Sequence, residues 1–292
     1  MSNQLIRNIN NSMLNFERLQ TQMSTGRKIN KPSDDPVGIT YAMRYRKELS
    51  DNEQYQKNVD SALSWLDFSD QMLDQVNDIT TRLKELTVQG SNGTNPQGAM
   101  DSIRQEVLQL KEQLVQIGNS QLNGKYVFNG QTYDKEPYDS VDLTKAATAE
   151  TDTGDVIYQA GAAAQLPINV SGSLFFGKKG ENDNVFAVID RIALALQNGE
   201  KDKVSAELTN IESRMQSVLS ARSELGAKVN RVELMENRLK DLEINLTELQ
   251  SKTEDVDMAK IIVLSKSAES VYQAALSTGA KIITPTLVDF IR

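Results

Sequence analysis

The sequence predicts a mainly α-helical protein, an elongated helical bundle or coiled-coil rod that carries a small β-rich inserted outer domain. Apolar residues recur at alternating steps of three and four over most of the chain, as in helices that pack along one narrow face. Only 39% of the 292 residues are hydrophobic and 5% are aromatic, which is little for two thick globular cores. Residues 119–184 are the exception, because glycines and aromatic residues gather there.

The first predicted helix lies near the N-terminus. Its apolar and small positions alternate between steps of four and three, while Asn, Gln and Arg fill its other faces. We expect this seam to pack against another helix in coiled-coil fashion. Its members are Leu5, Ile9, Ser12, Phe16, Leu19 and Met23.

A second seam lies near the C-terminus and has the same alternation. Its side chains are mostly small or β-branched, which permits a close approach of two helices. Each of the two terminal seams is too narrow to bury itself. The members of the second seam are Ile261, Leu264, Ala268, Val271, Ala275, Thr278 and Ile282.

Long helices are predicted between the two seams. Asp34 and Asp35 precede Pro36, which gives an N-cap followed by a proline in the first turn. That helix should run to the Gly- and Asn-rich residues 90–96, and a second one should follow from Met100 to about Gly118. A third should begin near 185, break at 198–199 and continue from 202 to 252. Its expected buried stripe is Leu225, Val229, Val232, Met235, Leu239, Leu242, Leu246 and Leu249.

The insertion should contain short strands at residues 126–128, 156–158 and 166–176, because β-prone runs there are separated by Asn, Gly, Asp and Pro. It holds seven of the 15 Phe and Tyr residues. We expect it at the tip of a helical hairpin, with the two chain ends together at the opposite end. The predicted division is therefore terminal helices 1–30 and 258–292, a helical rod 31–118 and 185–257, and an outer domain 119–184.

Composition excludes most enzyme chemistry. The chain has no His and no Cys, which removes the commonest general base, the thiolate nucleophile and the usual zinc ligands. The net charge is −8, and because both ends are mildly basic the body is more acidic still, which argues against nucleic acid. No secretory signal or membrane-spanning stretch is visible. We therefore expect no enzyme activity, no cofactor and no metal.

Three local patterns have a structural interpretation that outweighs a catalytic one. Gly172, Gly177 and Gly180 lie near two lysines but lack the spacing of a phosphate loop, so they should be turn glycines. Residues 265–267 (Ser-Lys-Ser) lie in a seam helix, where a lysine faces water. The methionines, among them Met13, Met23 and Met43, should fill gaps in helix cores.

Five blocks in fixed order resemble bacterial flagellins and their relatives. They are LQTQMSTGRKIN at 19–30, SDDPVGI at 33–39, LGAKVNR at 225–231, EDVDMA at 254–259 and YQAAL at 272–276. The resemblance covers roughly residues 3–130 and 200–292. Members of the family usually carry further residues ahead of the Asn-rich first helix. We therefore expect the terminal coiled coil to be lopsided in this chain.

Two details resemble the family members at the hook–filament junction more than filament flagellins. GKYVFNG at 124–130, with residues 131–132 and 137–138 close behind, is similar to the entry to the outer domain of the junction members. The loop reads KPSDDP at 31–36 instead of the Ser-Ala form of filament flagellins. The C-terminal tail is flagellin-like, so filament flagellin is the alternative, and a coiled-coil interaction protein outside the flagellum is the weaker one.

The resemblance implies an extracellular, structural subunit of the bacterial flagellum, exported by the type III apparatus without a cleavable signal. Its terminal helices would be disordered before export and would form a ring or helical polymer. Partners would be copies of itself, hook-associated protein 1 on the hook side, flagellin on the filament side and a secretion chaperone, with no nucleic acid and no membrane insertion. The expected polymer contacts are Leu5, Ile9, Phe16, Leu19, Met23, Leu264, Val271, Ala275 and Ile282, and the expected inter-domain loop residues are Arg27, Asn30, Ser33, Asp34, Asp35 and Pro36.

Overall fold

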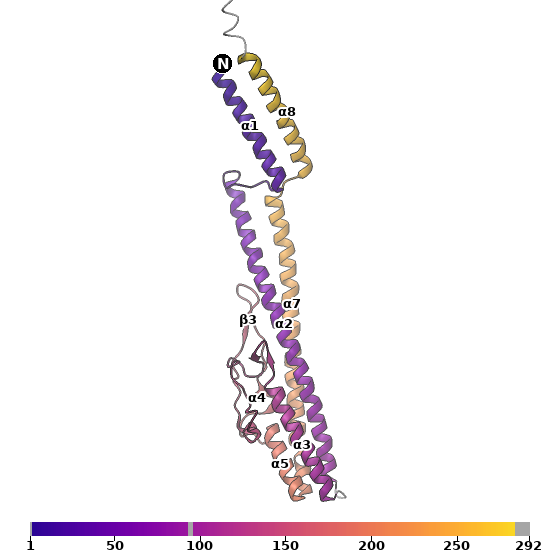
Figure 1. Ribbon diagram of the computed structural model, residues 1–292. Coiled ribbons are helices and arrows are strands. Elements are labelled where there is room, and N and C mark those ends of the chain that lie inside the picture. The colour runs from indigo at the N-terminus through magenta and orange to yellow at the C-terminus, as the bar shows by residue number, and fades with distance from the viewer. Residues whose placement is uncertain (1, 93–95, 284–292) are drawn as a thin grey trace, which may run out of the picture. The chain divides into compact units, whose positions relative to one another are not determined.

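The computed structural model describes residues 2–92 and 96–283 and confirms a mainly α-helical fold with few, short strands (Figure 1). Within these residues no helix is long and apolar enough to cross a membrane. The helices are α1 (Ser2–Thr25), α2 (Pro36–Ser91), α3 (Gln97–Gly118), α4 (Gly172–Phe176), α5 (Val185–Asn198), α6 (Lys201–Ala206), α7 (Leu208–Glu254) and α8 (Met258–Ile283), with a 3₁₀ helix at Leu143–Thr148.

The chain divides into two compact units, which are described separately. One holds residues 1–53 and 240–292, and the other holds residues 54–239. Helices α2 and α7 contribute to both units. These units cut across the three segments expected from the sequence, and the three-part division stays a prediction.

The predicted helix boundaries agree closely with the structure. Helix α2 begins at Pro36 and ends at Ser91, within the Gly- and Asn-rich residues 90–96, and α3 ends at Gly118. The break at residues 198–199 separates α5 from α6, where Gly199 has a φ of 71° and closes the end of α5. The predicted stripe on α7 is partly wrong: Leu225, Val232, Leu239 and Leu246 are buried at intervals of seven, whereas Leu242 and Leu249 are exposed.

The core of the second unit joins the long helices to the insertion. Helices α3 and α5 pack against each other, and their apolar faces meet those of α2 and α7. Five rings form an aromatic cluster at the base of the insertion, with centroid separations from 4.4 to 5.5 Å. The rings belong to Phe128, Tyr138, Phe175, Phe176 and Phe186.

The insertion holds two small antiparallel sheets and less strand than predicted. Strands β1 (Gln121–Leu122) and β2 (Lys125–Tyr126) form one hairpin, and β3 (Ile157–Gln159) and β4 (Gln165–Pro167) form the other. The strand predicted over residues 166–176 is wrong beyond Pro167, because Gly172–Phe176 is helix α4. There Phe175 and Phe176 turn inward to the aromatic cluster, so packing outweighs their strand preference.

The insertion does not lie at the tip of the helical hairpin. It folds back along the helices: Asn58 Nδ2 of α2 donates to the carbonyl of Gln159 at 2.8 Å, and Lys228 Nζ of α7 donates to that of Asn169 at 2.7 Å. The C-terminal end of α2 lies beside α5 and α6 instead, where a Cβ on Gly90 would meet Leu196 at 2.8 Å and Val204 at 3.6 Å. Helix α3 begins beside the C-terminal end of α5, where Gln97 Nε2 donates to the carbonyl of Leu196, and leads back to the insertion, which therefore lies beside α2.

Gly124 and Gly130, at the N-terminal end of the insertion, have backbone conformations that other residues rarely adopt. Asn123 and Gly124 have φ values of 53° and 76° between β1 and β2, as a type I′ hairpin turn requires. Gly130 has a φ of 50°, and a Cβ there would lie 2.5 Å from the carbonyl oxygen of Asp152. The path of the chain into the insertion therefore depends on glycine at positions 124 and 130.

We expect Gly130→Ala to lower the free energy of unfolding by about 1–3 kcal/mol, because positive φ and a backbone clash coincide at this position. Gly226→Ala is the matched control. Gly226 lies inside α7 with nothing within 4 Å of a new Cβ, so alanine should stabilise the chain by about 0.5–1 kcal/mol. Urea denaturation followed by circular dichroism measures both, and equal effects of the two substitutions would contradict the assignment.

Candidate functional site

Helices α1 and α8 form an antiparallel pair in the first unit (Figure 1). The rings of Phe16 and Tyr272 stack with centroids 6.5 Å apart and planes 7° from parallel. A Cβ on Gly279 would lie 3.2 Å from Ile9 Cδ1 and 3.6 Å from Leu5 Cδ2, so the helices approach closely at this end. The expectation that the two terminal seam helices pack against each other is confirmed for α1 and α8.

The seam on α8 is displaced from the predicted one. The residues turned toward α1 are Ile261, Ser265, Ala268, Tyr272, Ala275 and Gly279, all buried or half-buried. Leu264 and Val271, predicted on this seam, are 43% and 55% exposed, and Thr278 is also exposed. Apolar and small residues recur at steps of three and four on two adjacent faces of this helix. The face that turns toward α1 is the one with Tyr272, whose ring stacks on Phe16. The side chain of Ile282 lies outside the described residues.

The pair keeps much of its apolar surface in solvent. On α1 the seam residues Leu5, Ile9 and Phe16 are half-buried and Leu19 is buried, whereas Met23 is exposed. The interpretation of the methionines as core residues is wrong for Met13, Met23 and Met43, which are exposed because a two-helix layer has only one inner face. Further exposed apolar residues of the pair are Ile6, Leu14, Met258, Ile262, Val263, Leu264, Val271 and Leu276.

The loop before α2 is built by two neighbouring aspartates with different tasks. Asp35 Oδ1 accepts hydrogen bonds from the amides of Val37 at 3.1 Å and Gly38 at 2.9 Å, which caps α2. Asp34 Oδ2 accepts from the amides of Asn30 at 3.0 Å and Lys31 at 2.8 Å. The amide of Lys31, and next that of Asn30, holds the pKa of the Asp34 carboxyl below its usual value. The capping role predicted for this sequence is confirmed.

A buried carboxylate at the end of α7 binds α2 and lies beside the loop that follows α1. The Glu254 side chain is 2% exposed and binds Arg46 through two hydrogen bonds, Nε to Oε1 at 2.7 Å and Nη2 to Oε2 at 2.5 Å. Arg27 Nε lies 3.7 Å from the same carboxylate. These bonds raise the pKa of Arg46 further above its usual value. Glu254 and Arg46 were not singled out as site residues, although Glu254 begins a block shared with flagellins.

Backbone pairing reinforces this junction. The amide of Lys28 donates to the carbonyl of Glu254, and that of Val256 donates to Gly26 at 3.0 Å, so Arg27 and Asp255 form an antiparallel bridge. Asn30 Nδ2 donates to the carbonyl of Arg27 at 2.9 Å, which closes the loop. Ser33 and Pro36 are exposed beside it. The predicted loop residues therefore lie together, and their role in joining domains stays a prediction.

A groove of about 450 Å³ runs between this loop and the helix pair. Leu19, Ile29 and Ile261 belong to its apolar lining. Its polar lining has both charges, from Arg18, Lys28 and Lys260 and from Asp34, Asp35, Asp255 and Asp257. A shallower hollow continues from it along α1 and α8 past Leu264 and Val271. The apolar surface of the pair is thus concave near the loop and continuous with the exposed face of α8.

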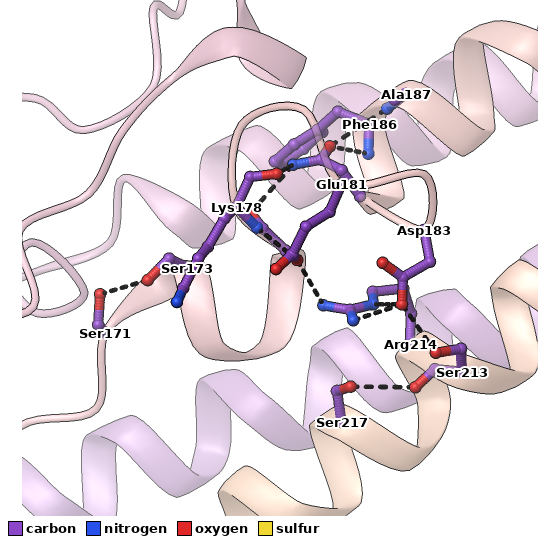
Figure 2. Close-up of polar contacts among 12 residues, drawn as sticks. Ser171, Ser173, Lys178, Glu181, Asp183, Phe186, Ala187, Ser213, Arg214 and Ser217 are labelled. Carbon is purple, nitrogen blue, oxygen red and sulfur yellow. Dashed lines mark hydrogen bonds and ion pairs between the residues drawn. The ribbon is translucent and has the colours of Figure 1, made fainter.

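The loop of Gly177 and Gly180 is a closed turn instead of a phosphate site. The Asn184 side chain caps α5, accepting from the amides of Phe186 and Ala187 at 3.1 and 3.2 Å, so the amides at the helix start already have a partner. Asp183 binds Ser213 and Arg214 of α7, and the Lys178 amide donates to Glu181 at 2.8 Å (Figure 2). These bonds attach the loop to α7.

The other chemical candidates also have structural roles. Ser265 is buried in the seam, while Lys266 points away and pairs with Glu269 at 2.9 Å, so the two do not form a nucleophile and base. Across residues 2–92 and 96–283, no group of three or more acidic side chains is placed to hold a metal ion. The most distinctive surface of the first unit is therefore the apolar face of the helix pair.

Sequence families agree with this architecture. Residues 1–132 match the bacterial flagellin N-terminal helical region, and residues 208–290 match the bacterial flagellin C-terminal helical region. The two matches contain all of α1, α2, α3, α7 and α8, and they leave out most of the insertion. The chain belongs to the bacterial flagellin family.

Within this family, the chain is similar to flagellar hook-associated proteins and to flagellins. The chain is 27% identical over 306 residues to flagellar hook-associated protein 3 of Escherichia coli (strain K12), covering 97% of this chain and 94% of the relative. It is 29% identical over 272 residues to flagellin of Bacillus subtilis (strain 168), covering 88% and 84%. A solved flagellar hook-associated protein of Vibrio parahaemolyticus has the same fold, with a TM-score of 0.70, 20% identity, and coverage of 76% of this chain and 100% of that one.

Arg46→Ala should destabilise the loop junction by about 3 kcal/mol, because it leaves the Glu254 carboxylate buried without its main partner. Native-state hydrogen exchange at the amides of Lys28 and Val256 measures the loss. Arg44→Ala is the control, since Arg44 is 71% exposed and pairs with Glu48 one turn away, and it should cost less than about 0.5 kcal/mol. Unchanged protection in Arg46→Ala would refute the proposed junction.

The Asp34 turn should be sensitive to acid. Because the folded pKa of Asp34 lies below its unfolded value of about 3.9, the turn's contribution to stability is complete above that pH and is lost as pH falls through the folded pKa. Amide NMR shifts of Asn30 and Lys31 should follow this titration, and Asp34→Ala should abolish it. A midpoint above 3.9 would contradict the observed hydrogen bonding.

Proposed function

We propose that this chain is the structural adaptor between the flagellar hook and filament. The observation that carries the proposal is similarity to hook-associated protein 3 of Escherichia coli across 97% of this chain and 94% of the relative, together with the fold shared with a solved flagellar hook-associated protein. An adaptor binds two differently built assemblies, so it needs its own outer region as well as the shared terminal helices. The proposed activity is assembly, without catalysis.

The polymer contact proposed is the exposed face of the α1–α8 pair. Two helices bury only the side chains between them, so the outer apolar residues remain for neighbouring subunits. Each one buried on assembly would contribute about 1.5–3 kcal/mol. Leu5, Ile9, Phe16, Leu19 and Ala275 hold the pair together, and Met23, Leu264 and Val271 face outward for the neighbour. Ordering of these helices on assembly stays a prediction.

The proposed partners follow from this role. They are further copies of the chain, hook-associated protein 1 on the hook side and flagellin on the filament side. A dedicated secretion chaperone would cover the apolar helix pair before assembly. The proposed location is the external flagellum, reached by type III export without a cleavable signal. Nucleic acid and membrane insertion are not part of the proposal.

Filament flagellin is a second candidate, favoured by the 29% identity to the Bacillus subtilis protein. A deletion strain separates the two. If the chain is the adaptor, the strain should release flagellin monomer into the medium and keep hooks without filaments. If the chain is flagellin, the strain should lack the filament protein itself.

The double substitution Leu264→Asp and Val271→Asp should abolish filament attachment while unit 54–239 stays folded, because both side chains face outward from α8. Motility and electron microscopy of the complemented deletion strain measure attachment, and circular dichroism of the purified chain measures folding. Leu219→Asp is the control, an equally exposed leucine on α7 outside the helix pair. Normal filaments on the double variant would argue strongly against the proposed contact.

A further inference from the structure

The outer face of α2 in the second unit is acidic over six turns. Between Lys57 and Arg82 the helix carries five aspartates and no basic residue. Asp60, Asp67 and Asp74 recur at intervals of seven, so they share one face, and all three are exposed. The buried residues of the same stretch centre on the opposite side of the helix, where Trp65 and Val76 lie.

Among these five aspartates, only Asp70 and Asp74 are neutralised by another of the described residues. Arg222 of α7 binds Asp74 at 2.7 Å and Asp70 at 3.3 Å. Asp60 and Asp67 form no side-chain hydrogen bond or ion pair with any of the described residues. Two carboxylates one heptad apart, about 10.5 Å along the axis, therefore face solvent without a cationic partner.

Helix α7 has a complementary face. Arg231, Leu234 and Arg238 occupy positions i, i+3 and i+7, so they form one strip, and Leu234 is 71% exposed. Neither arginine has an ion-pair partner among the described residues. Arg231 lies nine residues beyond Arg222, which places it half a turn around the helix from the side that touches α2. The basic strip and the acidic face therefore point in different directions.

The two faces match in spacing and in level. Lys84 pairs with Glu212 at 2.8 Å, and Asp70 and Asp74 pair with Arg222, so α2 and α7 are antiparallel and residue 67 is level with about residue 227. Pairing Asp67 with Arg231 and Asp60 with Arg238 keeps the seven-residue spacing on both sides. It requires an axial offset of four residues, about 6 Å, which long arginine side chains can span.

We propose that the acidic face of α2 (Asp60 and Asp67) binds the basic strip of α7 (Arg231, Leu234 and Arg238) on a neighbouring copy in the same orientation. This rests on the proposed role in flagellar assembly and names the side-by-side contact within it. Two unlike faces on one subunit give a head-to-tail contact, which repeats around a ring when the rotation closes. The ion pairs orient the copies, and Leu234 supplies apolar contact at the centre.

A second copy is the occupant because both halves of the contact are present on every chain. Same-orientation copies nearly level with one another bring the faces together without moving either helix. A basic partner protein would satisfy Asp60 and Asp67 but would leave Arg231, Leu234 and Arg238 uncovered on the far side. The charge balance of the pair of faces is therefore complete only between copies.

Charge reversal tests the pairing in cells that lack their own copy of the gene. Asp60→Lys with Asp67→Lys, and separately Arg231→Glu with Arg238→Glu, should each lower the amount of this chain on isolated flagella about tenfold, because like charges then face one another. All four reversals in one chain should restore it to within about twofold. Glu112→Lys with Asp134→Lys changes the net charge as the acidic-face variant does, at exposed sites elsewhere, and should have no effect.

Cross-linking tests the geometry, and the absence of native cysteine makes it specific. In a chain with Asp67→Cys and Arg231→Cys, mild oxidation of flagella should give a ladder of covalent multimers. Asp67→Cys with Glu233→Cys should give none, because Glu233 lies on another side of α7. Charge-reversal variants at wild-type level, or no multimers from the first cysteine pair, would overturn the proposed contact. Loss of junction localisation by the wild-type chain would instead overturn the proposed function.

Discussion

Every helix of the terminal pair has more apolar surface than one neighbour can bury, and this constraint organises the first unit. Small residues on α8, above all Gly279 and Ala275, let the two backbones approach, so the inner seam is tight but narrow. The outer apolar face stays exposed to water, where it does not stabilise the monomer. In the proposed assembly, neighbouring subunits would bury this face.

The pair is held to the chain by polar contacts that act in the opposite way, since they are complete within one molecule. Glu254 is buried with Arg46, two backbone hydrogen bonds join the loops, and the aspartates before α2 satisfy their own turn. Because its polar groups are already paired, this junction leaves few of them for a partner to bind, and its bonds fix the orientation of the helices. The residues of the junction therefore orient the helices, whereas other residues, on the outer face of α1 and α8, supply the exposed apolar surface.

Helix positions could be predicted from the sequence because spacing and capping are local. Pro36, Gly118 and Gly199 mark ends that the structure reproduces. Which face of α8 turns inward could not, since Leu264 and Val271 fit the heptad pattern as well as Ser265 and Tyr272 do, and only contact with Phe16 decides. The role of Glu254 could not be predicted, because its partner Arg46 is 208 residues away in the sequence and no local pattern indicates that the two side chains meet.

Because the insertion lies beside α2, its size does not affect the length of the long helices. Residues 119–184 leave from the end of α3 and rejoin at α5, so they are attached to the helices at Asn58 and Lys228 and do not lengthen them. Segments could grow or shrink between β3 and β4 without changing the spacing of the long helices. Evolution, or an engineer who wishes to display a peptide, can therefore vary this surface independently of the subunit's axial dimension.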